Sequence, residues 1–147
     1  MVLADHLGNC PWEVTASDIS TRVLDKVRTG HYPMHRADGI SRAHLSRYCL
    51  KGVNTQENTL LVDQKLRSRV NFKQVNLNQA LPALGEFDVI FLRNVMIYFN
   101  QETKRQIVQR MLPLLKPGGH FLIGHSESLI GVVDTLYPFA PSIYLKP

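Results

Sequence analysis

Residues 87–100 read FDVIFLRNVMIYFN, and this stretch decides the fold. Its first six residues form a nearly continuous apolar run that is rich in aromatic and β-branched side chains. Such a run is typical of a strand covered on both faces, as in a parallel sheet flanked by helices. The run stops at Arg93 and Asn94, and ligands of open α/β sheets bind beyond the carboxyl ends of the strands. The stretch therefore predicts a buried central strand that delivers Arg93, Asn94 and Tyr98 to a cleft.

Structural roles are the alternative for these three residues. The two polar residues after the strand could merely cap it or pair with Glu102. Tyr98 could be a core aromatic residue with a satisfied hydroxyl, although its neighbours Ile97 and Phe99 are the expected core residues. Polar groups directly after a buried apolar strand favour a binding site over these alternatives.

The length and composition predict one domain with a real hydrophobic core. The chain has 147 residues, of which 44% are hydrophobic. It contains no run of about 18 apolar residues, so we expect no membrane span. The N-terminus lacks the basic region of a signal peptide. Cys10 and Cys49 are too far apart in sequence to suggest a disulfide framework, so we expect a cytoplasmic protein.

The net charge of +5 favours an acidic partner. The basic residues are spread over residues 22–28, 36–51, 65–73 and 104–110 rather than gathered in one stripe. Solvated helix faces explain most of them, and a surface for nucleic acid or an acidic protein would use the remainder.

Two other kinds of chemistry find no support in the sequence. The six histidines show no metal-ligand spacing with either cysteine, so no metal site is predicted. Residues 124–128 resemble the G-x-S-x-G nucleophile elbow but lack its last glycine, and no histidine follows His125. These departures exclude a hydrolase of that type.

The first third of the chain predicts half of a nucleotide-binding unit. Residues 1–9 are expected to end an amphipathic helix that Gly8 closes. A strand at residues 13–19 contains Asp18 near its end, and Ser20 or Asp18 can cap the helix that follows. An acid at the end of a second strand commonly accepts hydrogen bonds from ribose hydroxyls, with helix capping as the alternative role.

Residues 48–72 predict a small antiparallel insertion of short alternating strands, after a loop at 31–40 and a short helix capped by Ser41. Residues 73–77 are expected to return to the main sheet. They end in Asn76 and Leu77, an amide and an apolar side chain that suit the polar edge and the face of an adenine ring.

Residues 100–145 predict a further helix and further strands of the same sheet. Asn100 is expected to cap a helix whose buried face extends to Leu115, and residues 116–119 form a turn. A buried strand follows at residues 120–124, and residues 135–145 fit a terminal antiparallel hairpin.

Several of these segments occur in the order seen in one known family. They are residues 16–20, 76–77, 87–99, 114–119 and 124–127, and together they span nearly the whole chain. The chain thereby resembles the chemotaxis receptor methyltransferases (CheR type). This resemblance implies transfer of a methyl group from S-adenosylmethionine to receptor glutamates, with S-adenosylhomocysteine as the product. The expected fold is a Rossmann-like class I methyltransferase sheet with the small antiparallel β insertion.

The resemblance also implies roles for single residues. Asp18 would bind the ribose of the cofactor, and Asn76 and Leu77 would border its adenine. Arg93 and Asn94 would line the cofactor pocket. Tyr98 would lie near the transferred methyl, so that Tyr98 and Arg93 are the candidate catalytic residues. The insertion at 48–72 would recognise a methyl-accepting chemotaxis receptor.

The chain departs from this family at its start. Family members carry an N-terminal helical domain, a first strand and a Gly-rich loop that touches the cofactor, so residues 1–147 would be a partial C-terminal methyltransferase domain. The missing first strand would leave unpaired edges in the middle of the sheet. We therefore expect weak or absent cofactor binding by this chain, together with self-association or a rearrangement of its strands.

Two alternative functions remain at this point. One is a non-catalytic receptor-binding module, and the other is a methyltransferase that acts on another substrate, such as nucleic acid. No aromatic-rich, Pro-containing motif follows the central strand to clamp a base, which argues against nucleic acid.

Overall fold

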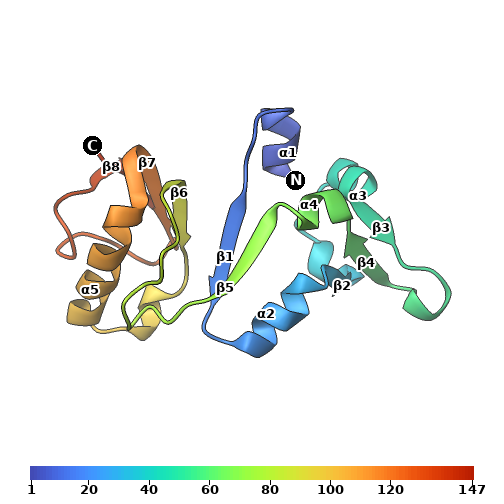
Figure 1. Ribbon diagram of the computed structural model, residues 1–147, viewed down its shortest axis with the longest axis horizontal. Coiled ribbons are helices and arrows are strands. Elements are labelled where there is room, and N and C mark those ends of the chain that lie inside the picture. The colour runs from blue at the N-terminus through green and yellow to red at the C-terminus, as the bar shows by residue number, and fades with distance from the viewer. The chain divides into compact units, whose positions relative to one another are not determined.

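The computed structural model describes residues 1–147 as two compact units, Met1–Val75 and Asn76–Pro147 (Figure 1). We call them the first unit and the second unit, and each is described by itself. None of the helices has both the length and the apolar character needed to cross a membrane.

A parallel pair of strands forms the centre of the first unit. Strand β1 (Val14–Asp18) pairs with β5 (Val70–Gln74) from Val14 opposite Val70 to Asp18 opposite Gln74. Helix α1 (Val2–Leu7) precedes β1, and α2 (Thr21–Arg28) follows it. The Ser20 hydroxyl caps α2 by accepting the Val23 N–H, as the sequence predicts.

An antiparallel sheet in the order β2-β4-β3 completes the first unit. Its strands are β2 (His31–Pro33), β3 (Cys49–Lys51) and β4 (Thr59–Val62). Helices α3 (Arg42–Tyr48) and α4 (Gln64–Arg67) lie before β3 and after β4 in the chain, and short 3-10 turns occupy Met34–Ala37 and Asn54–Gln56.

An antiparallel sheet lies in this region, but its strands differ from those of the expected insertion at residues 48–72. The expected loop at 31–40 is wrong, because His31–Pro33 pairs with β4. Residues 68–72 were assigned to the insertion, whereas Val70–Gln74 pairs in parallel with β1. Both errors concern short strands whose partners lie far away in sequence, which local periodicity does not reveal.

The second unit is a four-stranded mixed sheet in the order β6-β7-β9-β8. Strands β6 (Phe87–Leu92) and β7 (Leu115–Ile123) are parallel, and α5 (Gln101–Met111) connects them. Strands β8 (Tyr137–Ala140) and β9 (Ile143–Leu145) form the predicted terminal hairpin. Asn100 caps α5 through the Thr103 N–H, and 3-10 turns occupy Met96–Tyr98 and Leu112–Leu114.

The contiguous hydrophobic core belongs to the second unit. Its fully buried side chains come mainly from α5 and β7, and they include Ile107, Val108, Leu115 and Phe121, each 0% exposed. This mixture of parallel strands, a crossover helix and a terminal antiparallel hairpin confirms the predicted Rossmann-like α/β class.

Strand β6 is less covered than its apolar sequence predicts. Ile90 and Leu92 are buried in the core, but Val89 and Phe91 on the alternate positions are 44% and 67% exposed. Strand β6 pairs along one edge only, with β7, and β1 pairs along one edge only, with β5. The predicted unpaired edges are therefore present, and β1 and β6 have not rearranged to pair with other strands.

Two smaller expectations are wrong. Ile97 is 53% exposed, and Met96 is the buried residue of that turn at 1%. Residues 116–119 lie within the irregular start of β7, and Leu115 is its first residue rather than part of the helix face. Pro113 already ends the helical geometry in the turn Leu112–Leu114, so the chain turns earlier than the glycines suggest.

Candidate functional site

The segment after β6 carries three of the predicted site residues. Arg93 follows the strand directly, and Asn94 adopts a left-handed backbone conformation with φ of 58°. Asparagine tolerates this conformation better than most residues. The turn Met96–Tyr98 then buries Met96 and leaves Tyr98 80% exposed. The packing of Met96 therefore holds a segment whose polar side chains face solvent.

The Glu127 carboxylate fixes this segment to the loop after β7. One of its oxygens accepts the N–H groups of Gly124 at 2.6 Å and Asn94 at 3.0 Å, and the other accepts the Met96 N–H at 2.8 Å. Hydrogen bonds to a charged acceptor are stronger than neutral ones, and each backbone donor that leaves water needs a partner. The carboxylate is therefore a structural anchor for the carboxyl ends of β6 and β7.

Gly124 is required for this close approach. A Cβ atom at position 124 would lie 2.4 Å from the Asn94 side-chain oxygen and 2.7 Å from a Glu127 carboxylate oxygen. Any larger residue would displace Asn94 or Glu127, so the absence of a side chain here keeps the two loops together.

Asn76 and Leu77 lie at the start of the second unit. The Asn76 side-chain oxygen accepts the Asn78 N–H at 3.0 Å, which leaves its amide NH2 without a protein partner. Arg110 on α5 donates to the Leu77 carbonyl, and the Leu77 side chain packs against the core. These contacts hold the pair in place, and the free amide donor suits a heteroaromatic ligand edge.

Asp18 ends β1 in the first unit and is half-buried. One carboxylate oxygen accepts the Ser20 N–H at 2.8 Å, and the other has no hydrogen-bond partner. The sequence left binding and capping as alternatives, and the geometry permits both. The cap on α2 comes from Ser20 itself, and Asp18 keeps a free acceptor of the kind that a ribose hydroxyl needs.

The structure thus brings together Arg93, Asn94 and Tyr98 on one segment, and it anchors Asn76 and Leu77 separately. Arg93 forms no hydrogen bond or ion pair, whereas Glu102 pairs with Arg105 at 3.1 Å, so the alternative pairing of Arg93 is absent. The exposure of Tyr98 likewise contradicts a core role.

Sequence reasoning missed Glu127 and Arg110 as positioning residues. The sequence position of Glu127 could have indicated its role, because Glu127 follows a buried strand as Arg93 does and lies in the polar run 124–128. Nothing in the sequence indicated the role of Arg110, because its hydrogen-bond partner is a backbone carbonyl 33 residues away.

Comparison with known proteins places this architecture in a family. Residues 1–143 match the family described as "CheR methyltransferase, SAM binding domain". The chemotaxis protein methyltransferase of Escherichia coli (strain K12) is 44% identical over 131 residues, which cover 87% of this chain and 46% of that protein. Chemotaxis protein methyltransferase 2 of Pseudomonas aeruginosa is 37% identical over 147 residues, which cover 98% of this chain and 52% of that protein.

The chain therefore spans about half the length of the curated relatives that it matches. Among solved structures, the glycopeptide N-methyltransferase MtfA complexed with sinefungin aligns with a TM-score of 0.50 at 18% identity, over 92% of this chain and 51% of that chain. This likeness supports the methyltransferase fold alone. The family match and the identity to the two chemotaxis enzymes go further, and by them this chain belongs to the CheR methyltransferase family.

Proposed function

We propose that this chain is the catalytic part of an S-adenosylmethionine-dependent enzyme that methylates glutamate side chains of chemotaxis receptors. The observation that carries the proposal is the Glu127 anchor, which holds Arg93 and Asn94 at the carboxyl ends of β6 and β7. This edge is where open α/β sheets bind ligands.

The proposal assigns cofactor contacts to residues of both units. We propose that the free carboxylate oxygen of Asp18 accepts a ribose hydroxyl, and that the Asn76 amide and the Leu77 side chain border the adenine. Arg93, which has no protein partner, and Asn94 would also contact the cofactor. We propose that Tyr98, which is 80% exposed, lies near the transferred methyl.

The reaction requires little of the protein beyond binding the two reactants and aligning them. S-adenosylmethionine, when bound, supplies an electrophilic methyl group on a sulfonium. A glutamate side chain is already ionised at neutral pH, so it needs no strong general base. The chain's residues would bind and orient the two reactants for in-line displacement.

Titration of S-adenosylhomocysteine by calorimetry tests the cofactor site, with the E. coli relative as a positive control. We expect weak binding to this chain, because β1 and β6 each retain an open edge. Asp18→Ala should weaken it roughly tenfold or more, since it removes a hydrogen bond to a charged acceptor. Asp25→Ala, on the exposed face of α2, is the matched control and should change nothing. Equal loss in both variants would contradict the proposed site.

Product chemistry tests the substrate class. Transfer to a glutamate carboxylate forms a methyl ester, which mild alkali hydrolyses, whereas methylated amines and bases survive that treatment. Label from methyl-labelled S-adenosylmethionine on a receptor fragment should therefore be lost in alkali. Stable label would indicate another substrate.

The cellular location is part of the same proposal. Both Cys10 and Cys49 are free thiols, as is usual in the reducing cytoplasm. Methylation of the cytoplasmic part of a receptor would take place there.

A further inference from the structure

The positive charge of the chain is concentrated in one unit. The first unit carries eleven Lys and Arg against seven Asp and Glu, a net charge of +4, and the second carries six against five, a net charge of +1. The sequence alone shows a scattered distribution, so the fold decides where basic side chains meet. An acidic partner should accordingly contact the first unit.

A polar cleft of about 360 Å³ in the first unit gathers three of these cations. Arg47, Lys65 and Arg69 line it, together with one acid, Asp63. The Asp63 carboxylate accepts the Lys65 backbone N–H at 2.7 Å and so caps α4. The cleft therefore presents an excess of positive charge to a ligand.

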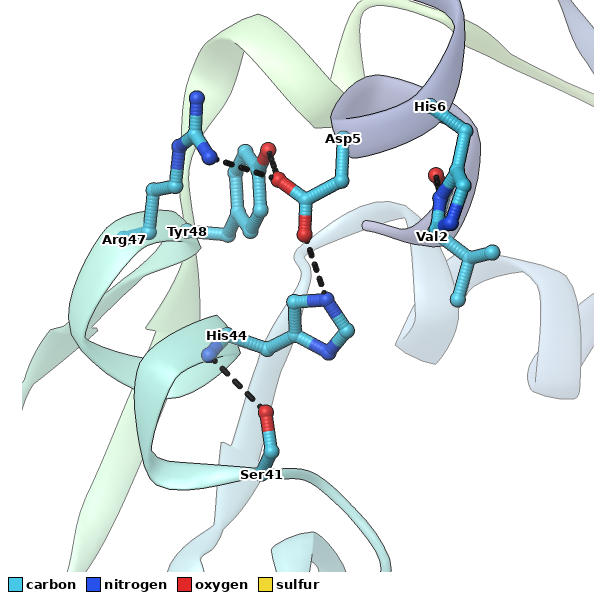
Figure 2. Close-up of polar contacts among 7 residues, drawn as sticks. All are labelled: Val2, Asp5, His6, Ser41, His44, Arg47 and Tyr48. Atoms are coloured by element: carbon cyan, nitrogen blue, oxygen red, sulfur yellow. Dashed lines mark hydrogen bonds and ion pairs between the residues drawn. The ribbon is translucent and has the colours of Figure 1, made fainter.

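The Asp5 carboxylate positions Arg47, one of the residues that line the cleft (Figure 2). Arg47 donates to one of its oxygens at 2.8 Å, the Tyr48 hydroxyl donates to the same oxygen, and His44 contacts the other at 2.7 Å. The Arg47 side chain remains 67% exposed, so the guanidinium keeps donors for a second carboxylate. Asp5 thus orients Arg47 without occupying it fully.

The other two cations that line the cleft, Lys65 and Arg69, are also available to a ligand. Arg69 donates to the Trp12 carbonyl at 3.3 Å, and its guanidinium stacks 5.3 Å from the centre of the Trp12 ring. The Lys65 ammonium forms no hydrogen bond or ion pair with the protein. Two fixed guanidinium groups and one free ammonium, beside the aromatic rings of Trp12 and Tyr48, suit carboxylates carried on aliphatic side chains.

We infer that this cleft, lined by Arg47, Lys65 and Arg69, binds a glutamate-rich segment of the protein substrate. The inference rests on the proposed function, because a receptor region that presents glutamates for methylation is the acidic partner expected. A nucleic acid fits less well, since it needs a long series of phosphate contacts and the cations here are confined to one small cleft.

Fluorescence anisotropy with a defined peptide tests the inference on the whole 147-residue chain. The probe is a fluorescein-labelled alanine-based helical peptide with glutamate at every fourth position, and its twin carries glutamine instead. At low salt the glutamate peptide should bind and the glutamine peptide should not. Lys65→Gln should weaken binding about threefold and Lys65→Glu roughly tenfold, because the second substitution replaces attraction with repulsion.

Lys26→Glu, an identical charge change on α2, is the matched control and should leave binding unchanged. Equal weakening by this control, or equal binding of both peptides, would overturn the inference. Competition gives a further test, with a single-stranded oligonucleotide of the same charge as the peptide. If the oligonucleotide displaced the labelled peptide at a lower concentration than the unlabelled peptide does, the inference would also be overturned. Titrating S-adenosylhomocysteine into the same variants separates the two proposals: loss of peptide binding with cofactor binding intact concerns the cleft alone, and the reverse concerns the cofactor site alone.

Discussion

Glu127 accepts three backbone N–H groups from two loops, so its replacement tests how far single side chains hold the site together. Glu127→Gln keeps the shape but turns one acceptor into a donor that faces N–H groups. We expect the free energy of unfolding to fall by about 2 kcal/mol, the size of a lost charge-assisted hydrogen bond. Urea denaturation measures this difference.

Glu86→Gln makes the same chemical change on an exposed side chain without hydrogen bonds, and its unfolding free energy should stay within about 0.5 kcal/mol of the parent. Equal stability of the two variants would show that the three N–H groups find other partners. The signal of Asn94 in an amide spectrum should also shift in Glu127→Gln, because its N–H loses an anionic acceptor.

At the scale of elements, α1 depends on a single carboxylate. It has six residues and buries none of them, and a helix this short is marginal without tertiary contacts. Asp5 connects it to α3 through Tyr48, His44 and Arg47. These donors, chiefly the Tyr48 hydroxyl, lower the pKa of Asp5 below its ordinary value of 3.8, and the same bond raises the pKa of Tyr48.

The sign of the pH dependence follows from the lowered pKa. The stabilising contribution of Asp5 is fully present above its unfolded pKa and is lost as the pH falls through the lower folded value. We therefore expect the protection factors of the α1 amides, which compare each exchange rate with that of the unfolded chain at the same pH, to fall below about pH 4. In Asp5→Asn these protection factors should be lower already at neutral pH. Asp25→Asn, whose partner Arg28 lies on the same helix, should leave exchange in α1 unchanged. Unchanged protection of the α1 amides in Asp5→Asn would contradict this account.

Local chemistry explains which elements the sequence predicts. Ser20, Ser41 and Asn100 cap their helices through side chains that accept nearby N–H groups, and such caps are readable from the sequence. The three-residue strand β2 was missed because its pairing with β4 depends on residues about 28 positions away. The position of Arg93 after a strand was predictable for a related reason, since it depends on local sequence. The hydrogen bonds from Asn94 and Met96 to Glu127 were not, because they join residues 33 and 31 positions apart.

At the scale of the whole molecule, burial is uneven. The second unit holds twelve of the buried apolar side chains, and the first holds four: Leu24, Ala37, Leu60 and Val75. Stability rises with buried apolar area, so the core amides of the second unit should be the best protected from exchange. The first unit contains the cleft and α1, the parts that we expect to move most.

The open edge of β6 leads to the last prediction, which is self-association. An unpaired strand edge with exposed apolar side chains is a template for pairing with another chain, and Phe91 and Val89 are 67% and 44% exposed beside that edge. We expect sedimentation velocity to show mass that increases with protein concentration. Phe91→Lys should weaken this association roughly tenfold, because a lysine beside an edge strand opposes pairing. Val53→Lys adds the same charge at a position that is 68% exposed in the antiparallel insertion, and it should leave association unchanged. A monomer at all concentrations, or equal dissociation by both variants, would mean that the edge of β6 is not the contact.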